Sequence, residues 1–204
     1  MFNTEFLITS LVVVLIPGTG VLYTVSTGLF LGRRESIAAA FGCTIGIIPH
    51  LSASILGLSA ILHMSALAFQ IIKFAGAAYL LYLAWSIWRE TGAIKFKPPS
   101  SKNGLWQIAR RAFLINILNP KLSIFFLAFL PLFVLPNTSS PIFDMFSLGV
   151  VFMAMTFFIF TLYGVLANGV RKYVVSSPRL IIWLKRSFAA TFAALGVKLA
   201  MTEQ

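Results

Sequence analysis

Long apolar segments separated by short polar ones set the strongest limit on how this chain can fold. A helix crosses the hydrocarbon core of a bilayer with about 20 mostly apolar residues. Of the 204 residues, 59% are hydrophobic and only 10% are charged, with a mean hydropathy of +0.93. A soluble domain needs roughly a quarter of its residues charged. The sequence therefore predicts an all-α integral membrane protein, with residues 1–204 forming a single transmembrane domain.

Six segments meet the requirement for a transmembrane helix. They are Phe6–Leu31, Ser36–Leu62, Leu67–Trp88, Ala112–Leu135, Met145–Leu166 and Leu180–Met201. The last contains Lys185, Arg186 and Lys198, all toward its two ends, where long side chains can reach the headgroups. The alternative for this segment is a helix that lies along the membrane interface.

The basic residues predict the orientation. There are 16 Lys and Arg against five Asp and Glu. They lie between apolar segments and form no stripe with interleaved aromatics, so we do not expect nucleic acid as a partner. With six spans, one side holds thirteen of the sixteen and is predicted to be cytoplasmic, with both termini outside. These thirteen are Arg33, Arg34, Arg89, Lys95, Lys97, Lys102, Arg110, Arg111, Arg171, Lys172, Arg179, Lys185 and Arg186.

The longest connection divides the chain into two halves. Residues 91–110 carry Lys, Ser and Pro-Pro and predict a cytoplasmic linker between a first repeat, 1–90, and a second repeat, 111–204. Three spans is an odd number, so similar halves would be inverted relative to each other in the membrane. Each half has a proline midway along its first span, Pro17 and Pro120. Inverted repeats with broken first helices are typical of secondary carriers.

The first break contains Pro17, Gly18, Thr19 and Gly20. Proline removes a backbone donor, and glycine loosens the helix further. Carbonyls freed in hydrocarbon must be surrounded by protein or a water-filled cavity. The functional interpretation is a substrate site built from backbone dipoles, and the alternative is an ordinary kink.

The second break contains Asn119, Pro120 and Lys121. Lys121 lies too deep in the fourth span to reach the headgroups easily, and charges inside a membrane usually face a cavity or a partner. It could pair with a substrate carboxylate or titrate during transport. The alternative is a lysine bonded to carbonyls freed at Pro120. Asn116 and Lys73 are weaker candidates for the same pathway.

Gly42, Gly46 and His50 share one helical face because they are four residues apart. The two glycines predict close helix packing. His50 could relay protons, since its unperturbed pKa is near neutrality. Its alternative role is an interhelical hydrogen bond, and Pro49 beside it predicts a further local break.

Several kinds of chemistry are not indicated. The five acids, Glu5, Glu35, Glu90, Asp144 and Glu203, fall at span ends or in loops, and Cys43 is the single cysteine. We therefore expect no metal site and no cofactor. No nucleophile–base motif or phosphate-binding glycine loop is present in the sequence, so we expect no enzyme.

The chain resembles the LysE/RhtB amino-acid exporter family nearly end to end. The stretches that carry the resemblance are IPGTGVLYTVSTGLFLGRRESIAAAFG, KFAGAAYLLYLAW, ILNPKLSIFFLAFLPLFV and WLKRSFAATFAALGVKLA. The resemblance implies six spans in a bacterial plasma membrane. The matching motif positions are Pro17, Gly18, Gly42, Gly46, His50, Lys73, Gly76, Asn119, Pro120 and Lys121. Thr19, Gly20 and Ile47 depart from the family pattern, which commonly has proline and an acid or amide in the first break and aspartate after the second glycine.

The function implied by the resemblance is efflux of amino acids or close derivatives, driven by the proton gradient. The lipid bilayer and a small amino-acid-like solute are the expected partners, and a homo-oligomer is left open. One alternative is a heavy-metal cation exporter, against which the missing carboxylates argue. The other is a membrane partner protein or enzyme that transports nothing.

Overall fold

The computed structural model describes residues 4–15, 18–62, 66–89, 104–134 and 138–174, together with Arg186, Ala190, Ala193, Ala194, Val197 and Met201. Every element in these ranges is helical and none is a strand, which confirms the all-α prediction. The rest of the predicted sixth span, Leu180–Met201, lies outside the described residues, as do Pro17 and most of the predicted linker.

The predicted broken helices are present in both halves. α1 (Thr4–Leu15) and α2 (Thr19–Phe30) meet at 56°. α6 (Leu105–Ile117) meets the segment Pro120–Phe133 at 53°. That segment consists of α7 (Pro120–Ile124), the π-helical η1 (Phe125–Phe129) and the 3-10 helix η2 (Leu130–Phe133). Both bends lie at a proline of the sequence, because proline cannot donate to the preceding turn. An inverted relation between the halves stays a prediction.

The other helices are α3 (Arg33–Ile45), α4 (Ile48–Leu62), α5 (Ala66–Arg89) and α8 (Pro141–Val174). By length and hydropathy, two described helical segments can cross a membrane by themselves, Arg33–Gly57 and Pro141–Ala167. Counting each bent pair as one span raises the number to four. α5 coincides with the predicted third span, and the total of six stays a prediction. The interruption between α3 and α4 agrees with the break expected at Pro49.

The last part of the predicted linker, residues 91–110, is helical. α6 begins at Leu105, seven residues before the predicted start of the fourth span at Ala112. Arg110, which the prediction placed in this connection, lies on the exposed face of α6, while Ile108 is fully buried. An amphipathic helix can carry such charges on one face while the opposite face packs.

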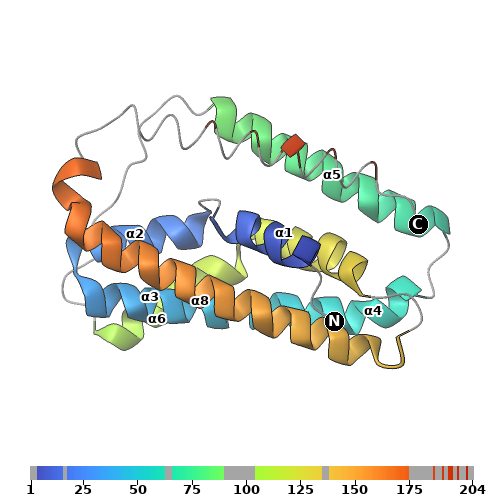
Figure 1. The fold of residues 1–204 in the computed structure, drawn as a ribbon, viewed down its shortest axis with the longest axis horizontal. Helices are drawn as coiled ribbons and strands as arrows, with labels where there is room; N and C mark the ends of the chain where they lie inside the picture. Colours follow the sequence, from blue (N-terminus) through green and yellow to red (C-terminus); the bar gives the residue numbers. More distant parts are fainter. Residues whose placement is uncertain are drawn as a thin grey trace.

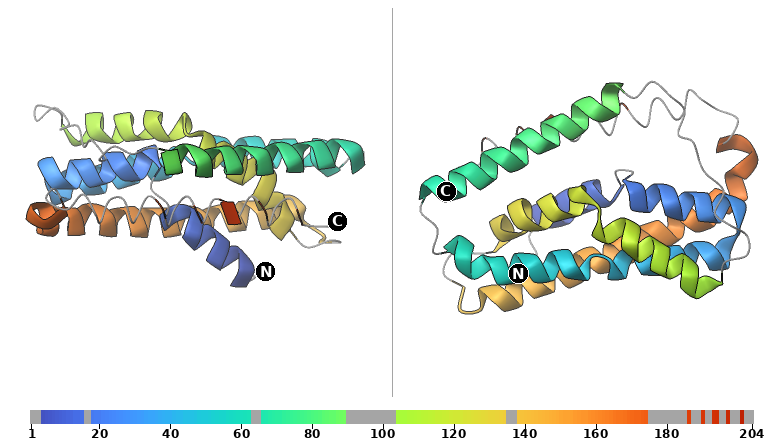
Figure 2. Two further views of the ribbon diagram at one scale, coloured as in Figure 1. Left: turned by 90° about the horizontal axis from the view of Figure 1, so that it is seen from above. Right: turned by 180° about the vertical axis from the view of Figure 1, so that it is seen from behind.

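α8 forms the spine of the bundle, with α2 and α3 packed against it and α6 packed on α3 (Figures 1 and 2). Glycines allow the closest crossings. A Cβ on Gly28 would lie 2.1 Å from the carbonyl oxygen of Gly164, and one on Gly42 would lie 2.1 Å from that of Ala109. The Gly42 contact confirms that this glycine face packs closely. α5 lies along the edge of the bundle (Figure 1).

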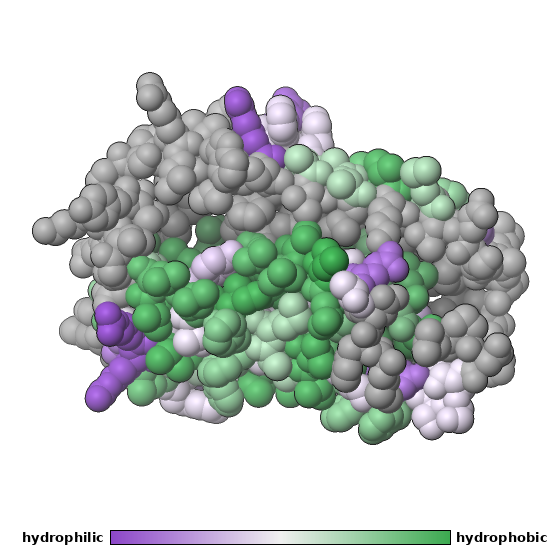
Figure 3. All heavy atoms as spheres, in the orientation of Figure 1, coloured by the Kyte–Doolittle hydropathy of each residue, from purple (hydrophilic) through white to green (hydrophobic). Residues whose placement is uncertain are grey.

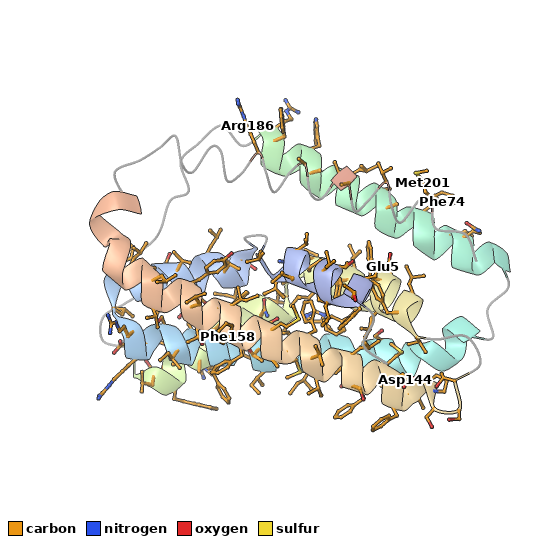
Figure 4. All side chains as sticks on the ribbon, in the orientation of Figure 1. Glu5, Phe74, Asp144, Phe158, Arg186 and Met201 are labelled. Carbon is orange, nitrogen blue, oxygen red and sulfur yellow. The ribbon has the colours of Figure 1, made fainter. Side chains whose placement is uncertain are left out.

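On the face that Figure 3 shows, most of the described surface is apolar, and hydrophilic side chains gather in a few separate places. Large side chains project outward from several helices, including Leu56, Trp106, Leu118 and Phe158. Figure 4 labels the exposed Phe158 on α8, Asp144 at the lower right of the view and Arg186 at the top. Such a surface is suited to lipid.

Candidate functional site

A small cavity lies where the two bent pairs face each other in the core. It is lined by Val13, Val14, Gly18, Gly20, Val21, Asn116, Asn119, Lys121, Leu122, Phe152, Thr156 and Phe160. The space open to water-sized molecules is about 10 Å³, the order of one water. In this conformation the site therefore has no room for an amino acid.

Lys121 joins the second break to the first. Its Nζ donates a hydrogen bond to the carbonyl oxygen of Val13, 3.0 Å away and 108 residues distant in sequence. In a continuous helix, this carbonyl would accept from the residue four positions later, which is Pro17 and has no N–H. Lys121 thus supplies the hydrogen bond that Pro17 cannot donate to the Val13 carbonyl. This partner belongs to the first half, whereas the sequence interpretation placed the freed carbonyls at Pro120.

At the second break, His50 bonds to the carbonyl that Pro120 leaves without a helical donor. Its Nε2 lies 3.2 Å from the carbonyl oxygen of Asn116, which would otherwise accept from residue 120, a proline. The backbone N–H of Asn119 also donates to this oxygen, at 3.0 Å. The Ser123 hydroxyl lies 3.2 Å from His50 Nδ1. Because a carbonyl only accepts, a neutral ring donates from Nε2 and accepts at Nδ1 from Ser123. His50 therefore makes the interhelical bond that was its alternative interpretation.

A third carbonyl, which loses its helical donor because of Pro131, also accepts from a side chain on another helix. In η1, the N–H of Leu130 donates five residues back to Phe125. The next such bond would reach Phe126 from Pro131, which has no N–H. The hydroxyl of Ser54, on α4, donates to the Phe126 carbonyl instead.

The side chain of Asn116 bonds to a carbonyl that is left without a helical donor at the break between α3 and α4. Ile47 N–H bonds to the carbonyl of Thr44, so the Cys43 carbonyl loses its helical donor. The Asn116 side-chain NH₂ donates to this carbonyl at 2.6 Å. Its Oδ1 accepts from the amide of Asn119 at 3.3 Å. Asn116 thus links α3 and α6 to the start of α7, which extends the role the sequence assigned to it.

Replacing Ser54 with alanine is expected to destabilise the fold by about 1–2 kcal/mol, because the Phe126 carbonyl would lose its donor in an apolar environment. The check is the melting temperature of the purified protein in detergent, which should fall by several degrees. Ser52→Ala is the matched control, since Ser52 lies on the exposed face of the same helix. Equal melting temperatures for the two variants would contradict the assignment.

The sequence candidates divide into three groups. Gly18, Gly20, Asn116, Asn119 and Lys121 line the cavity. Gly42 and Gly46 pack against α6, and His50 bonds to it, without lining the cavity. Thr19 and Pro120 are exposed. The side chain of Lys73, on α5, and the whole of Pro17 lie outside the described residues.

Sequence reasoning missed the contribution of α8 to the cavity. Thr156, Phe152 and Phe160 form one wall, and the Thr156 hydroxyl donates to the carbonyl of Phe152 at 2.9 Å. Their spacing of four residues places them on one face of α8. The only sequence signal for this wall was Thr156, a polar residue in an apolar span. Many such threonines only bond to their own helix, so this signal did not indicate a cavity.

The geometry defines a class of protein. Helices apolar enough to span a membrane, broken near their middles around a small cavity with a few polar side chains on its wall, characterise α-helical membrane carriers. The sequence profile of the LysE type translocators matches residues 11–203, and the chain belongs to this family.

Relatives cover nearly the whole chain. A homoserine/homoserine lactone efflux protein of Salmonella typhimurium is 31% identical over 96% of this chain and 94% of its own length. A membrane protein of Vibrio cholerae is 33% identical over 96% of this chain and 94% of its own length. A leucine efflux protein of Klebsiella pneumoniae is 21% identical over 96% of this chain and 92% of its own length. No solved structure matches the chain.

Proposed function

We propose that this LysE family translocator is a secondary active exporter of amino acids or small amino-acid derivatives, driven by the proton gradient. The observation that carries the proposal is the closed cavity between two proline breaks, with Lys121, Asn119 and Asn116 on its wall. Relatives of similar length are named for efflux of homoserine, homoserine lactone and leucine, which supports a small amino-acid-like substrate.

Alternating access follows from the size of the cavity. Space for about one water excludes any amino acid, so the substrate enters only when elements around the breaks move apart. The bonds that cross between elements at the breaks, from Lys121 and His50, are the contacts that such a movement would exchange. The proposed transport cycle opens the same cavity to each side in turn.

We further propose a bacterial plasma-membrane location with both termini outside. α3 begins and α8 ends at one end of the bundle, whereas α4 ends and α8 begins at the other (Figure 1). Arg33 and Arg34 are exposed at the first of these ends, and Asp144 lies in the first turn of α8 at the opposite end. The positive-inside rule assigns the arginine end to the cytoplasm.

The test uses bacteria without their own amino-acid exporters that express this chain. After loading with mixed dipeptides, cells should release one or a few free amino acids faster than cells without the chain, and collapse of the proton gradient should abolish the difference. We expect Lys121→Met to reduce this release at least tenfold at equal protein levels, about 1.4 kcal/mol or more. Unchanged release of every amino acid from cells with the protein in the membrane would contradict the proposal.

A further inference from the structure

We infer that Lys121 is a clasp between the two broken helices and that the carboxylate of the substrate opens it by taking the place of the Val13 carbonyl. This inference rests on the proposed export function and adds the substrate class to it. It assigns the cavity at Lys121 as a carboxylate-binding subsite.

The clasp joins two helices that lie far apart in the sequence. Lys121 is the second residue of α7, and Val13 lies in the last turn of α1. A Cβ built on Gly18 would lie 3.4 Å from both Lys121 Nζ and Asn119 Nδ2, so these two donors converge on the start of α2. Both side chains are more than nine-tenths buried and line the cavity. A substrate in this space therefore meets an ammonium and an amide donor together.

The Val13 carbonyl is an acceptor that a carboxylate can replace. A carbonyl carries no net charge, whereas a carboxylate adds the attraction between two full charges to its hydrogen bond with an ammonium. A carboxylate in the cavity can therefore compete with the Val13 carbonyl for Lys121 Nζ. The Val13 carbonyl would then need water or a substrate donor, because Pro17 supplies no N–H.

The cavity wall narrows the substrate class further. None of its twelve described residues is acidic. Lys121 has Asn116, Asn119 and Thr156 as its polar neighbours on this wall, and the other eight are apolar or glycine. A cationic side chain would enter beside an ammonium and meet no acidic group on this wall. The subsite therefore favours amino acids with a free carboxylate and a neutral side chain over lysine or arginine, and over amides and lactones.

Opening the clasp links recognition to movement. While Lys121 bonds to Val13, the end of α1 is tied to α7 and the cavity has room for about one water. When the carboxylate takes over the lysine, this tie is released and α1 can move. A solute without a carboxylate would leave the clasp closed and would not trigger transport.

The experiment measures efflux of labelled leucine or homoserine from proteoliposomes that contain the full chain. Unlabelled leucine, leucinamide, homoserine and homoserine lactone are loaded as competitors. We expect each free acid to compete at a concentration at least tenfold lower than its amide or lactone. Lys121→Met should remove this difference, and Lys121→Arg should retain part of it. The comparison in the unaltered chain needs no variant and so does not depend on variant folding.

Each outcome has a distinct meaning. Efflux with equal competition by acid and amide overturns the carboxylate subsite and leaves the proposed export function intact. A folded Lys121→Met protein that keeps the tenfold preference also overturns the clasp. Absence of efflux of both labelled acids from correctly inserted protein overturns a subsite for free acids with neutral side chains, whereas the proposed export function fails only if no amino acid is released.

Discussion

Replacing Gly42 with alanine is expected to prevent this chain from reaching its folded state in the membrane. The added Cβ would lie 2.1 Å from the carbonyl oxygen of Ala109, 2.8 Å from its carbonyl carbon and 2.9 Å from its Cα. All three atoms belong to the backbone of α6, so no flexible side chain can yield. Extra atoms in a packed core cost about 1–3 kcal/mol even where side chains can shift, and we expect the upper end or beyond here.

The measurement is the amount of monodisperse protein recovered after detergent extraction, with the melting temperature of whatever remains. Gly57→Ala is the matched control, because a Cβ on Gly57 has no atom within 4 Å among the described residues. We expect near-normal recovery for Gly57→Ala and almost none for Gly42→Ala. Similar recovery of both would show that α3 and α6 are farther apart in the membrane than in this structure.

Replacing Asn116 with leucine is expected to abolish efflux and to destabilise the fold by several kcal/mol. The variant leaves the Cys43 carbonyl and the Asn119 amide each without the partner that Asn116 provides. Each buried polar group without a partner costs about 1–3 kcal/mol. Asn116 also fits tightly, since its Cβ would lie 3.0 Å from a Cβ on Gly46. The branched carbons of leucine would crowd α3 and could not replace the hydrogen bond that Asn116 makes to it.

Thermal melting in detergent and efflux from cells measure the two effects separately. Leu114→Ala is the control on the same helix, because Leu114 is half exposed on its outer face. We expect Leu114→Ala to retain both properties. An Asn116→Leu protein that melts normally and exports at the normal rate would show that the α3–α4 and α6–α7 breaks do not depend on this side chain.

The positions of the helix breaks were predictable because their cause is local. Pro17, Pro49 and Pro120 each remove one backbone donor, whatever surrounds them. α1, α3 and α6 accordingly end two, four and three residues before Pro17, Pro49 and Pro120. The close approach predicted from Gly42 and Gly46 is confirmed for the same reason, since only a residue without a side chain permits backbone contact.

The start of α6 and the places of Thr19 and Pro120 were not predictable. The sequence placed Arg110 in the connection before the fourth span, whereas the structure has a helix from Leu105 whose Ala109 backbone packs closely on Gly42 of α3. Thr19 and Pro120 belong to breaks that line the cavity, yet both are exposed. The direction of a side chain at a break depends on how the two helix pieces are rotated, which no local pattern records.

By itself, the sequence determined the membrane environment and the loss of helical donors for the carbonyls of Val13 and Asn116, since apolar length and the missing N–H groups of Pro17 and Pro120 are properties of the chain. Only the tertiary structure decided which donors replace them. Lys121 reaches Val13 and His50 reaches Asn116 across separations of 108 and 66 residues. These pairs form because helix packing brings the breaks together, and a buried acceptor there takes whichever donor lies within reach.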